Sequence, residues 1–426
     1  MARSVKSNIG VGKKQRVWFL AESFYPPFVG GLEKHAHLLL SKLVSADMDV
    51  TVLTRKMDPT SPAHEVFKNV PIRRIPPVGI LKGKGWNALV PLLSLLVRVT
   101  YLLLRHAKRY DILMVSGVRV LSIPAVLVSK VLHKPCVIRS GSPIELQEAI
   151  STESLKKMGF PGVNVLLRIL RNIRNGVLRR ADCLVAISEE IRQQYLDIGV
   201  DSRRIAEIPN GADPSVFHPV TEADKFRLRR EFGLPDDRAI FVFTGRLARM
   251  KGVMDLVYIW DEMVRRYPKI HLLYVGSGKR SVDGCEDELK TFIRENDLEA
   301  YVTLAGEVDS VCEYLQAADV FVFPSDYEGF GSALLEAVFC GLPAIATNVG
   351  VAAQVIRDGE YGRLVAPKDP AELRSAIVWM LERRDHWKAM GAHAATAAGG
   401  EYSIDNEARR YMDLFDDLRK GAGEAS

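Results

Sequence analysis

The chain has 426 residues, enough for two domains of ordinary size, and its 47% hydrophobic and 26% charged residues are typical of a globular protein with a packed core. Its five cysteines are odd in number and scattered, with no CxxC pair, which excludes a disulfide framework or a zinc site and favours reduced thiols in the cytosol. The net charge of +6 is unevenly divided: residues 1–200 hold 30 Lys and Arg against 14 Asp and Glu, and the remainder holds 28 against 38. The basic half requires an anionic partner or surface, for which nucleic acid, a phosphorylated substrate and acidic lipid all qualify.

Apolar runs alternate with amphipathic stretches through the first half of the chain. Residues 1–15 are basic and polar, and we expect a disordered tail there, because the apolar run that follows is far too short for a signal peptide. An amphipathic helix is predicted at 32–45. Strands are predicted at 16–21, 49–54, 70–75, 112–115, 136–140 and 183–187, with helical segments between the later ones.

Two segments of this half have a composition that suits a membrane surface. Residues 87–109 form a helical stretch whose apolar centre is about 17 residues long, the lower limit for crossing a bilayer. Pro91 and Arg98 interrupt that centre, so a buried helix, or one lying on a membrane surface, is favoured over a transmembrane span. Residues 155–180 mix apolar with basic residues, and either a solvated helix face or contact with acidic lipid explains this pattern.

A Pro- and Gly-bearing crossing near residues 205–211 separates the two halves. We predict an N-terminal domain at 1–210 and a C-terminal domain at 211–402, with a last helix at 403–420 that packs back on the first domain. Alternation restarts after the crossing with strands at 240–243, 270–275, 301–304 and 320–323 and helices at 252–267, 286–296 and 310–318. Alternation at this spacing in both halves predicts an α/β fold: two doubly wound, Rossmann-like parallel sheets that face each other across a cleft.

Residues 320–347, VFVFPSDYEGFGSALLEAVFCGLPAIAT, form the most informative stretch. A buried strand is predicted at 320–323, a turn-rich loop at 324–331, a helix at 332–340 and the next strand from residue 344. Glu328 lies in the loop and Glu336 about one turn inside the helix. A strand, a glycine-bearing loop and a helix N-terminus direct backbone N–H groups at polar oxygens. The eight-residue spacing of the two glutamates does not by itself indicate a ligand site. It fits equally well a structural turn in which one glutamate is solvated and the other caps the helix.

Three other loops follow predicted strands, where parallel α/β sheets bind ligands. Gly30 and Gly31 stand between the first strand and a helix, and they let a phosphate approach the backbone closely. The loop at 245–252 follows the strand at 240–243, and its Arg246 and Lys251 are suited to clamping a pyrophosphate. A third glycine turn occupies 276–278, where a plain tight turn and a ligand contact are equally compatible with the sequence.

Other classes of site are not indicated. The chain has no Ser/His/Asp arrangement, no HExxH, no GxGxxG at a strand–helix turn and no cluster of histidines. The basic half also lacks regularly interleaved aromatic residues, which argues against the hypothesis that it binds nucleic acid.

Together these motifs resemble the retaining, nucleotide-sugar-dependent glycosyltransferases of family 4, which have the GT-B fold, and the resemblance covers nearly the whole chain. The residues that carry it are Gly30-Gly31, Asn210-Gly211-Ala212-Asp213, Gly245-Arg246 with Lys251-Gly252, Gly276-Ser277-Gly278 and, above all, EGFGSALLEAVFCGLPAIAT. The last string is similar to the family's E-x7-E motif along its full length.

The resemblance implies a role for each of these residues. Arg246 and Lys251 would bind the donor diphosphate and stabilise the departing nucleoside diphosphate, which makes a separate metal or other cofactor unnecessary. Glu336 would hold the ribose hydroxyls, and Glu328 would lie near the donor sugar, as nucleophile or as stabiliser of an oxocarbenium-like transition state. Gly31 would close over the phosphates from the other domain. The remaining donor-binding residues would be Gly30, Gly245, Gly276, Gly329, Phe330, Gly331 and Ser332.

One loop departs from the family pattern. Many relatives carry a histidine after the strand at 136–140, where this chain has Arg139 and Ser140. An arginine accepts no proton, but it binds anionic groups, so these two residues are candidates for acceptor or anion binding.

The expected function is retaining transfer of a sugar from a UDP- or GDP-sugar to an acceptor hydroxyl in glycan, lipopolysaccharide or glycolipid assembly. The acceptor would be a glycan or lipid-linked, or otherwise anionic, and the protein cytoplasmic, with peripheral contact to an acidic membrane surface and no nucleic-acid partner. The alternatives are a sugar-nucleotide epimerase or phosphorolytic enzyme of the same fold, and a non-catalytic scaffold of a polysaccharide-assembly complex.

Overall fold

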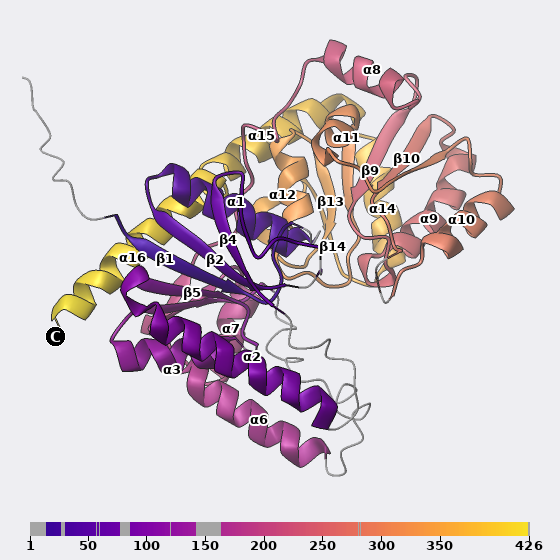
Figure 1. Cartoon of the computed structure of the whole chain (residues 1–426). Helices are drawn as coiled ribbons and strands as arrows, with labels where there is room; N and C mark the ends of the chain where they lie inside the picture. Colours follow the sequence, from indigo (N-terminus) through magenta and orange to yellow (C-terminus); the bar gives the residue numbers. More distant parts are fainter. Residues whose placement is uncertain are drawn as a thin grey trace, which may run out of the picture. The chain divides into compact units, whose positions relative to one another are not determined.

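The computed structural model describes residues 14–26, 30–56, 58, 60–76, 86–119, 121–141, 163–279, 281 and 283–424 (Figure 1). Residues 1–13 of the tail expected at 1–15, and residues 155–162 of the expected basic helix, lie outside these ranges. The chain divides into two compact units. Unit 1 comprises Met1–Ile208 and Ala408–Ser426, and unit 2 comprises Pro209–Glu407.

Unit 1 contains an eight-stranded sheet in the order β3-β4-β2-β1-β5-β6-β7-β8. Its strands are β1 (Arg16–Ala21), β2 (Asp49–Arg55), β3 (His64–Phe67), β4 (Val70–Ile75), β5 (Ile112–Ser116), β6 (Cys136–Arg139), β7 (Cys183–Ala186) and β8 (Ile205–Glu207). The six predicted strands are confirmed. The sheet is not wholly parallel, because β3 pairs antiparallel with β4. This edge strand was missed because its residues are exposed or half-buried and form no apolar run.

The helices of unit 1 are α1 (Gly31–Ser45), α2 (Trp86–Arg105), α3 (Ser122–Leu132), α6 (Val163–Leu178) and α7 (Glu189–Asp197). Helix α3 packs on β5 and β6 and also contacts α2 and α6. A 3-10 turn at Ala107–Arg109 follows α2, so the predicted helical stretch 87–109 is two elements. Within the described ranges, no helix is both long and apolar enough to cross a bilayer.

Unit 2 contains a six-stranded, fully parallel sheet in the order β11-β10-β9-β12-β13-β14. Its strands are β9 (Ala239–Thr244), β10 (Ile270–Val275), β11 (Val302–Gly306), β12 (Val320–Phe323), β13 (Ala344–Thr347) and β14 (Gly362–Val365). The helices are α8 (Glu222–Glu231), α9 (Val253–Arg266), α10 (Glu286–Glu295), α11 (Val311–Ala317), α12 (Ser332–Phe339), α13 (Ala352–Val355), α14 (Pro370–Leu381) and α15 (Trp387–Gly399); α16 (Ile404–Glu424) begins in this unit and continues in unit 1.

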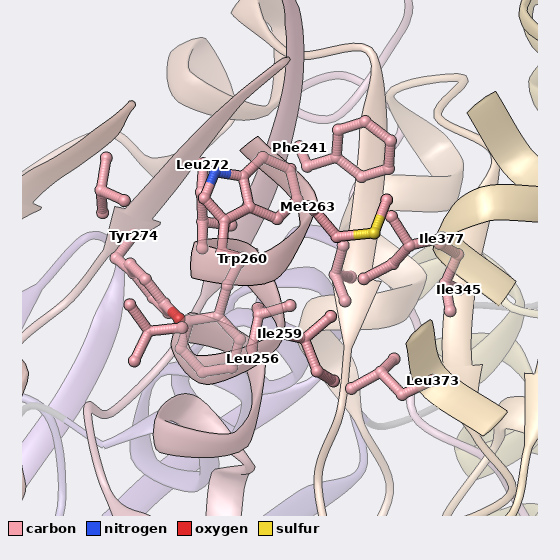
Figure 2. Packing of buried hydrophobic residues seen from close by; sticks show 14 of the residues in the cluster. Phe241, Leu256, Ile259, Trp260, Met263, Leu272, Tyr274, Ile345, Leu373 and Ile377 are labelled. Atoms are coloured by element: carbon pink, nitrogen blue, oxygen red, sulfur yellow. The ribbon is translucent and has the colours of Figure 1, made fainter. Parts of the chain in front are cut away.

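The core of unit 2 explains why its central strands could be predicted from the sequence. Every residue of β9, β10, β12 and β13 is buried, because helices cover both faces of a parallel sheet. Trp260 of α9 packs edge-on against Phe241 of β9, with ring centroids 5.3 Å apart, and its indole N–H donates to the Tyr301 carbonyl (Figure 2). Helix α14 closes the same cluster with Ile377.

A buried charge cluster joins α8 to the start of β12. The Asp319 carboxylate accepts from the Lys225 ammonium at 2.8 Å, from the Arg229 guanidinium at 2.7 Å and from the Ile240 backbone N–H at 2.8 Å. These bonds tie the helix that opens unit 2 to its two central strands. The five cysteines are all free and buried, which confirms the prediction that they form no disulfide framework.

Candidate active site

The site in unit 2 lies at the carboxyl edge of its sheet, where the strand order reverses. Counted along the unit, β9 is the first strand and β12 the fourth, and the order 3-2-1-4-5-6 makes β9 and β12 the neighbours at which the connections change direction. Doubly wound sheets bind ligands in the crevice outside such a switch point. The loops that flank it are 245–252 after β9 and 324–331 after β12, the two loops that carry Arg246, Lys251 and Glu328.

The two loops interlock through their backbones. A Cβ added at Gly252, whose φ is +66°, would lie 2.0 Å from the Pro324 carbonyl oxygen. The Asp326 N–H donates to the Met250 carbonyl at 3.0 Å. The glycine therefore permits a close backbone approach that no other residue allows, and this approach fixes the distance between Lys251 and the Glu328 loop.

Lys251 and Glu328 form an ion pair across the switch point. The Lys251 ammonium donates to Glu328 Oε1 at 2.6 Å, and the two side chains are 15% and 13% exposed. The fully buried Ser325 hydroxyl donates to the same oxygen at 2.9 Å. Partial burial weakens solvent screening, so the pair is a preformed arrangement of one cation and one carboxylate with restricted access to water.

Ser325 is held in place by the neighbouring strand. The Thr347 hydroxyl, at the end of β13, lies 2.6 Å from the Ser325 carbonyl oxygen and 3.2 Å from the Phe323 carbonyl oxygen. Because this hydroxyl is buried, it donates to these two acceptors and fixes the start of the loop. Thr347 therefore positions Glu328 through Ser325, and the sequence contained no sign of this connection.

The glycine turn after β10 packs directly against the loop after β9. Gly276 has a φ of +136°, and a Cβ added there would lie 1.9 Å from the Gly245 carbonyl oxygen. Glu286 Oε2, at the start of α10, accepts from the Ser277 hydroxyl at 2.6 Å and from the Gly278 N–H at 2.9 Å. Lys290 and Ser277, and then the Gly278 N–H, lower the pKa of Glu286 to about 2. The ionised Glu286 carboxylate thus fixes the turn at Ser277 and Gly278 through these hydrogen bonds. The sequence did not indicate this role, because acidic residues are common in the first turn of a helix.

The basic residues of the loop after β9 differ in their surroundings. Arg249 pairs with Glu288 on α10, so its charge is neutralised at the surface. Arg246 is exposed, and across the ranges that the structure describes its guanidinium makes no hydrogen bond or ion pair. Arg246 is therefore the cation of this loop that is open to an anionic ligand, whereas Lys251 is already paired with Glu328 and would have to share its charge with such a ligand.

Helix α12 begins at the same edge without a side-chain cap. Its N-cap is Gly331, with φ +97°, and among the residues that the structure describes this cap makes no side-chain hydrogen bond, so the helix start at Ser332 presents backbone donors. Phe330 is buried and its carbonyl accepts from the Val351 N–H at 2.7 Å, which fixes Gly329–Gly331 against the loop after β13. Glu336 is half-buried in the second turn of the helix.

Unit 1 holds the other predicted residues. Gly30 is the N-cap of α1, and a Cβ there would lie 2.1 Å from Glu33 Oε2. The Ser23 hydroxyl donates to Glu33 Oε1 at 2.8 Å. A carboxylate therefore lies at the helix N-terminus where the glycines predict a phosphate. A Cβ added at Gly31 meets no atom of the described residues within 4 Å.

Arg139 ends strand β6 with no exposed surface. Its Nη2 donates to Nδ1 of the buried His35 on α1 at 3.0 Å, so the cation lies beside the helix that Gly31 opens. Ser140 is equally buried, and its N–H donates to the Tyr195 hydroxyl at 3.1 Å. The structure thus joins Lys251 and Glu328 directly in unit 2, and in unit 1 it sets Arg139 against His35 of the helix that Gly31 opens, whereas Arg246 is near the Lys251–Glu328 pair only in belonging to the same loop as Lys251.

A matched pair of glycines tests the close approach of the two loops in unit 2. Gly252 and Gly233 have nearly the same φ, +66° and +65°, but an added Cβ at Gly233 meets no atom of the described residues within 4 Å. Gly233→Ala is expected to cost about 1–2 kcal/mol of unfolding free energy through φ alone. Gly252→Ala is expected to cost at least about 2 kcal/mol more, because loop 249–252 must move off Pro324. Urea unfolding measures both, and equal costs would contradict the close approach.

Comparison with known proteins first identifies the fold. The chain superposes on sucrose-phosphate synthase from Thermosynechococcus elongatus with a TM-score of 0.75 and 25% identity, over 96% of this chain and 100% of that one. It also superposes on Anabaena Alr3699/HepE in complex with UDP-glucose, with a TM-score of 0.73 and 19% identity, over 94% and 99% of the two chains. These are GT-B glycosyltransferase structures, and the predicted fold class is confirmed.

The family models then identify the two domains. Residues 29–216 match the model described as Glycosyltransferase Family 4, and residues 224–396 match Glycosyl transferases group 1. The first half of the chain is thus similar to family 4 glycosyltransferase domains and the second half to group 1 glycosyltransferase domains. The interlocked loops around Lys251 and Glu328 belong to the second of these.

Curated relatives point to the same class. The D-inositol 3-phosphate glycosyltransferase of Acidothermus cellulolyticus is 31% identical over 250 residues, which are 57% of this chain and 54% of that protein. The protein of the same name from Geodermatophilus obscurus is 31% identical over 261 residues, 58% and 56% of the two chains. The matches thus span little more than half the length of these relatives.

Proposed function

We propose that this chain is a retaining glycosyltransferase that moves a sugar from a UDP- or GDP-sugar to an acceptor hydroxyl. The observation that carries the proposal is the Lys251–Glu328 ion pair at the switch point of the group 1 domain. A cation and a carboxylate held 2.6 Å apart, where such sheets bind ligands, are suited to a substrate that joins a diphosphate to a sugar. A neighbouring structure was determined with UDP-glucose, which supports this class of donor.

The chemistry assigns one task to each residue. Arg246 and Lys251 bind the donor diphosphate and stabilise the charge that develops on the departing nucleoside diphosphate, which is the work of a metal ion in other transferases. Glu328 acts at the anomeric carbon, where a carboxylate stabilises oxocarbenium-like charge or forms the covalent intermediate. Glu336 holds the ribose hydroxyls, and the open N–H groups at the start of α12 receive phosphate and sugar oxygens.

We infer an anionic acceptor, received by unit 1. Residues 1–200 carry 30 basic against 14 acidic side chains, and Arg139 places a fully buried cation next to α1. The curated relatives are named for an acceptor that bears a phosphate. A phosphorylated or lipid-linked acceptor at the cytoplasmic face of a membrane fits these charges and a role in glycan, lipopolysaccharide or glycolipid assembly.

A panel of nucleotide sugars tests the donor assignment by thermal shift. At a concentration of about 100 Kd, the right donor is expected to add about 2.7 kcal/mol of stability through mass action, whereas donors with the wrong base add little. The shift is expected to persist in EDTA, because Arg246 and Lys251 provide the neutralising charge. Failure of every UDP- and GDP-sugar to raise the midpoint would overturn the assignment.

Product analysis separates the alternatives. A transferase needs an acceptor to form a new glycosidic bond, apart from slow hydrolysis of the donor, and a retaining one keeps the anomeric configuration. A changed donor sugar in the absence of any acceptor would identify an epimerase instead. Donor binding with neither transfer nor hydrolysis would indicate a scaffold.

A further inference from the structure

Three helices of unit 1 carry most of the exposed large apolar side chains. Twelve such side chains stand out among the described residues, and eight of them belong to α2, α3 and α6. Figure 1 shows these helices together on one side of the sheet of unit 1, with α3 in contact with both of the others. We call their solvent-facing side the α2–α3–α6 surface.

The exposed residues follow helical spacing. On α2 they are Leu93, Val97, Tyr101 and Leu104, a stripe along one side of the helix, and Val97 is 67% exposed. The opposite stripe is the buried one: Leu95, Val99 and Leu103 are at most 8% exposed. Helix α2 is therefore apolar on the side that faces solvent as well as on the side that faces the core.

The other two helices repeat the pattern at a spacing of one turn. Helix α3 exposes Leu127 and Val131, and α6 exposes Ile169 and Ile173, the last at 53%. Scattered single apolar residues need no explanation, but a contiguous set over neighbouring helices marks an interaction site.

The charges of the same helices all have one sign. The sequences of α2, α3 and α6 contain no Asp or Glu. Exposed arginines adjoin the apolar stripes at Arg98 and Arg105 on α2 and at Arg168 and Arg171 on α6. The only lysine, Lys130 on α3, pairs with Asp182. An apolar protein partner would explain the exposed apolar side chains but not the arginines. An anionic bilayer explains both, because its acyl chains match the apolar side chains and its phosphates match the arginines.

We propose that the α2–α3–α6 surface binds the face of an anionic lipid bilayer. The apolar stripes enter the boundary between head groups and acyl chains, and the arginines extend from the same helices to lipid phosphates. Each basic side chain near such a surface strengthens binding, and salt weakens it. This inference depends on unit 1 alone and would survive failure of the proposed sugar transfer.

Vesicle sedimentation with the full chain tests the proposal. The protein is expected to sediment with vesicles of phosphatidylcholine and phosphatidylglycerol at low salt and to remain in solution with phosphatidylcholine alone. Val97→Glu is expected to weaken the partition coefficient at least about tenfold, and so is Arg98→Glu, because the first adds a charge to the apolar stripe and the second reverses a lipid contact.

Val66→Glu is the matched control. Val66 lies on β3 and is 69% exposed, so the same charge is added at the same exposure outside the surface. This variant is expected to bind vesicles like the wild type, and all variants to keep the wild-type thermal midpoint. Equal binding by Val97→Glu and Val66→Glu would overturn the proposal. So would a wild-type dimer that Val97→Glu dissociates, because a second copy would then cover the surface.

Discussion

Replacing Lys251 by Ala is expected to lower kcat for sugar transfer by about 10²–10³-fold. The Lys251 ammonium is the more buried of the two candidate phosphate ligands, and Gly252 and Pro324 fix its loop. Under the proposed function, this ammonium would neutralise the leaving diphosphate as the glycosidic bond breaks, so its loss would act mainly on the transition state. Steady-state kinetics with the donor identified by thermal shift measures the effect, and Arg246→Ala is expected to follow in the same direction.

Two controls separate catalysis from structure. Arg249 belongs to the same loop as Lys251, but its guanidinium pairs with Glu288 at the surface. Arg249→Ala is therefore expected to change kcat less than about twofold. If Lys251 served only to satisfy Glu328, Lys251→Ala would leave the affinity for the nucleoside diphosphate, which lacks the sugar, unchanged. We expect that affinity to fall in Lys251→Ala, and equally in the double variant Lys251→Ala with Glu328→Gln, and an unchanged affinity would contradict the assignment.

The fold could be predicted because of where its strands lie. Strands β9, β10, β12 and β13 are buried on both faces, so each appears in the sequence as a continuous apolar run with a turn at its end. The strands that were missed, β3, β8 and β14, contain half-buried or exposed residues and form edges. At an edge, pairing with a neighbour contributes more to the structure than local hydrophobicity does, although the edge strand β11 was still predicted, at 301–304.

The candidate site could be predicted only as a set of loops. Arg246, Lys251 and Glu328 were found because each follows a strand end. The ion pair between Lys251 and Glu328 joins residues 77 positions apart, and it depends on the strand order that makes β9 and β12 neighbours. The supporting role of Thr347 depends on the pairing of β12 with β13, and Glu286 bonds a turn only eight residues before it. They became apparent only from distances between side chains.

Replacing Asp319 by Asn is expected to destabilise unit 2 by about 3–5 kcal/mol. The substitution leaves Arg229, 4% exposed, and Lys225, 18% exposed, without the carboxylate that compensates them. The matched control is Glu262→Gln, which breaks an Arg374–Glu262 pair of the same 2.7 Å length whose side chains are 48% and 60% exposed. That change is expected to cost less than about 1 kcal/mol, since solvent screens the pair. Urea unfolding compares the two variants.

The same carboxylate gives the stability of unit 2 a defined pH dependence. Burial alone would raise the pKa of Asp319, but the charges of Lys225 and Arg229 outweigh it, and the net effect is a lowered pKa. A carboxyl whose pKa is lower in the folded state contributes stability above its unfolded pKa, about 3.9, and loses it as the pH falls through the folded value. The difference in unfolding free energy between wild type and Asp319→Asn is therefore expected to be constant near neutral pH and to shrink below about pH 4. A difference that stays constant at acid pH would show that the pair does not hold Asp319 ionised.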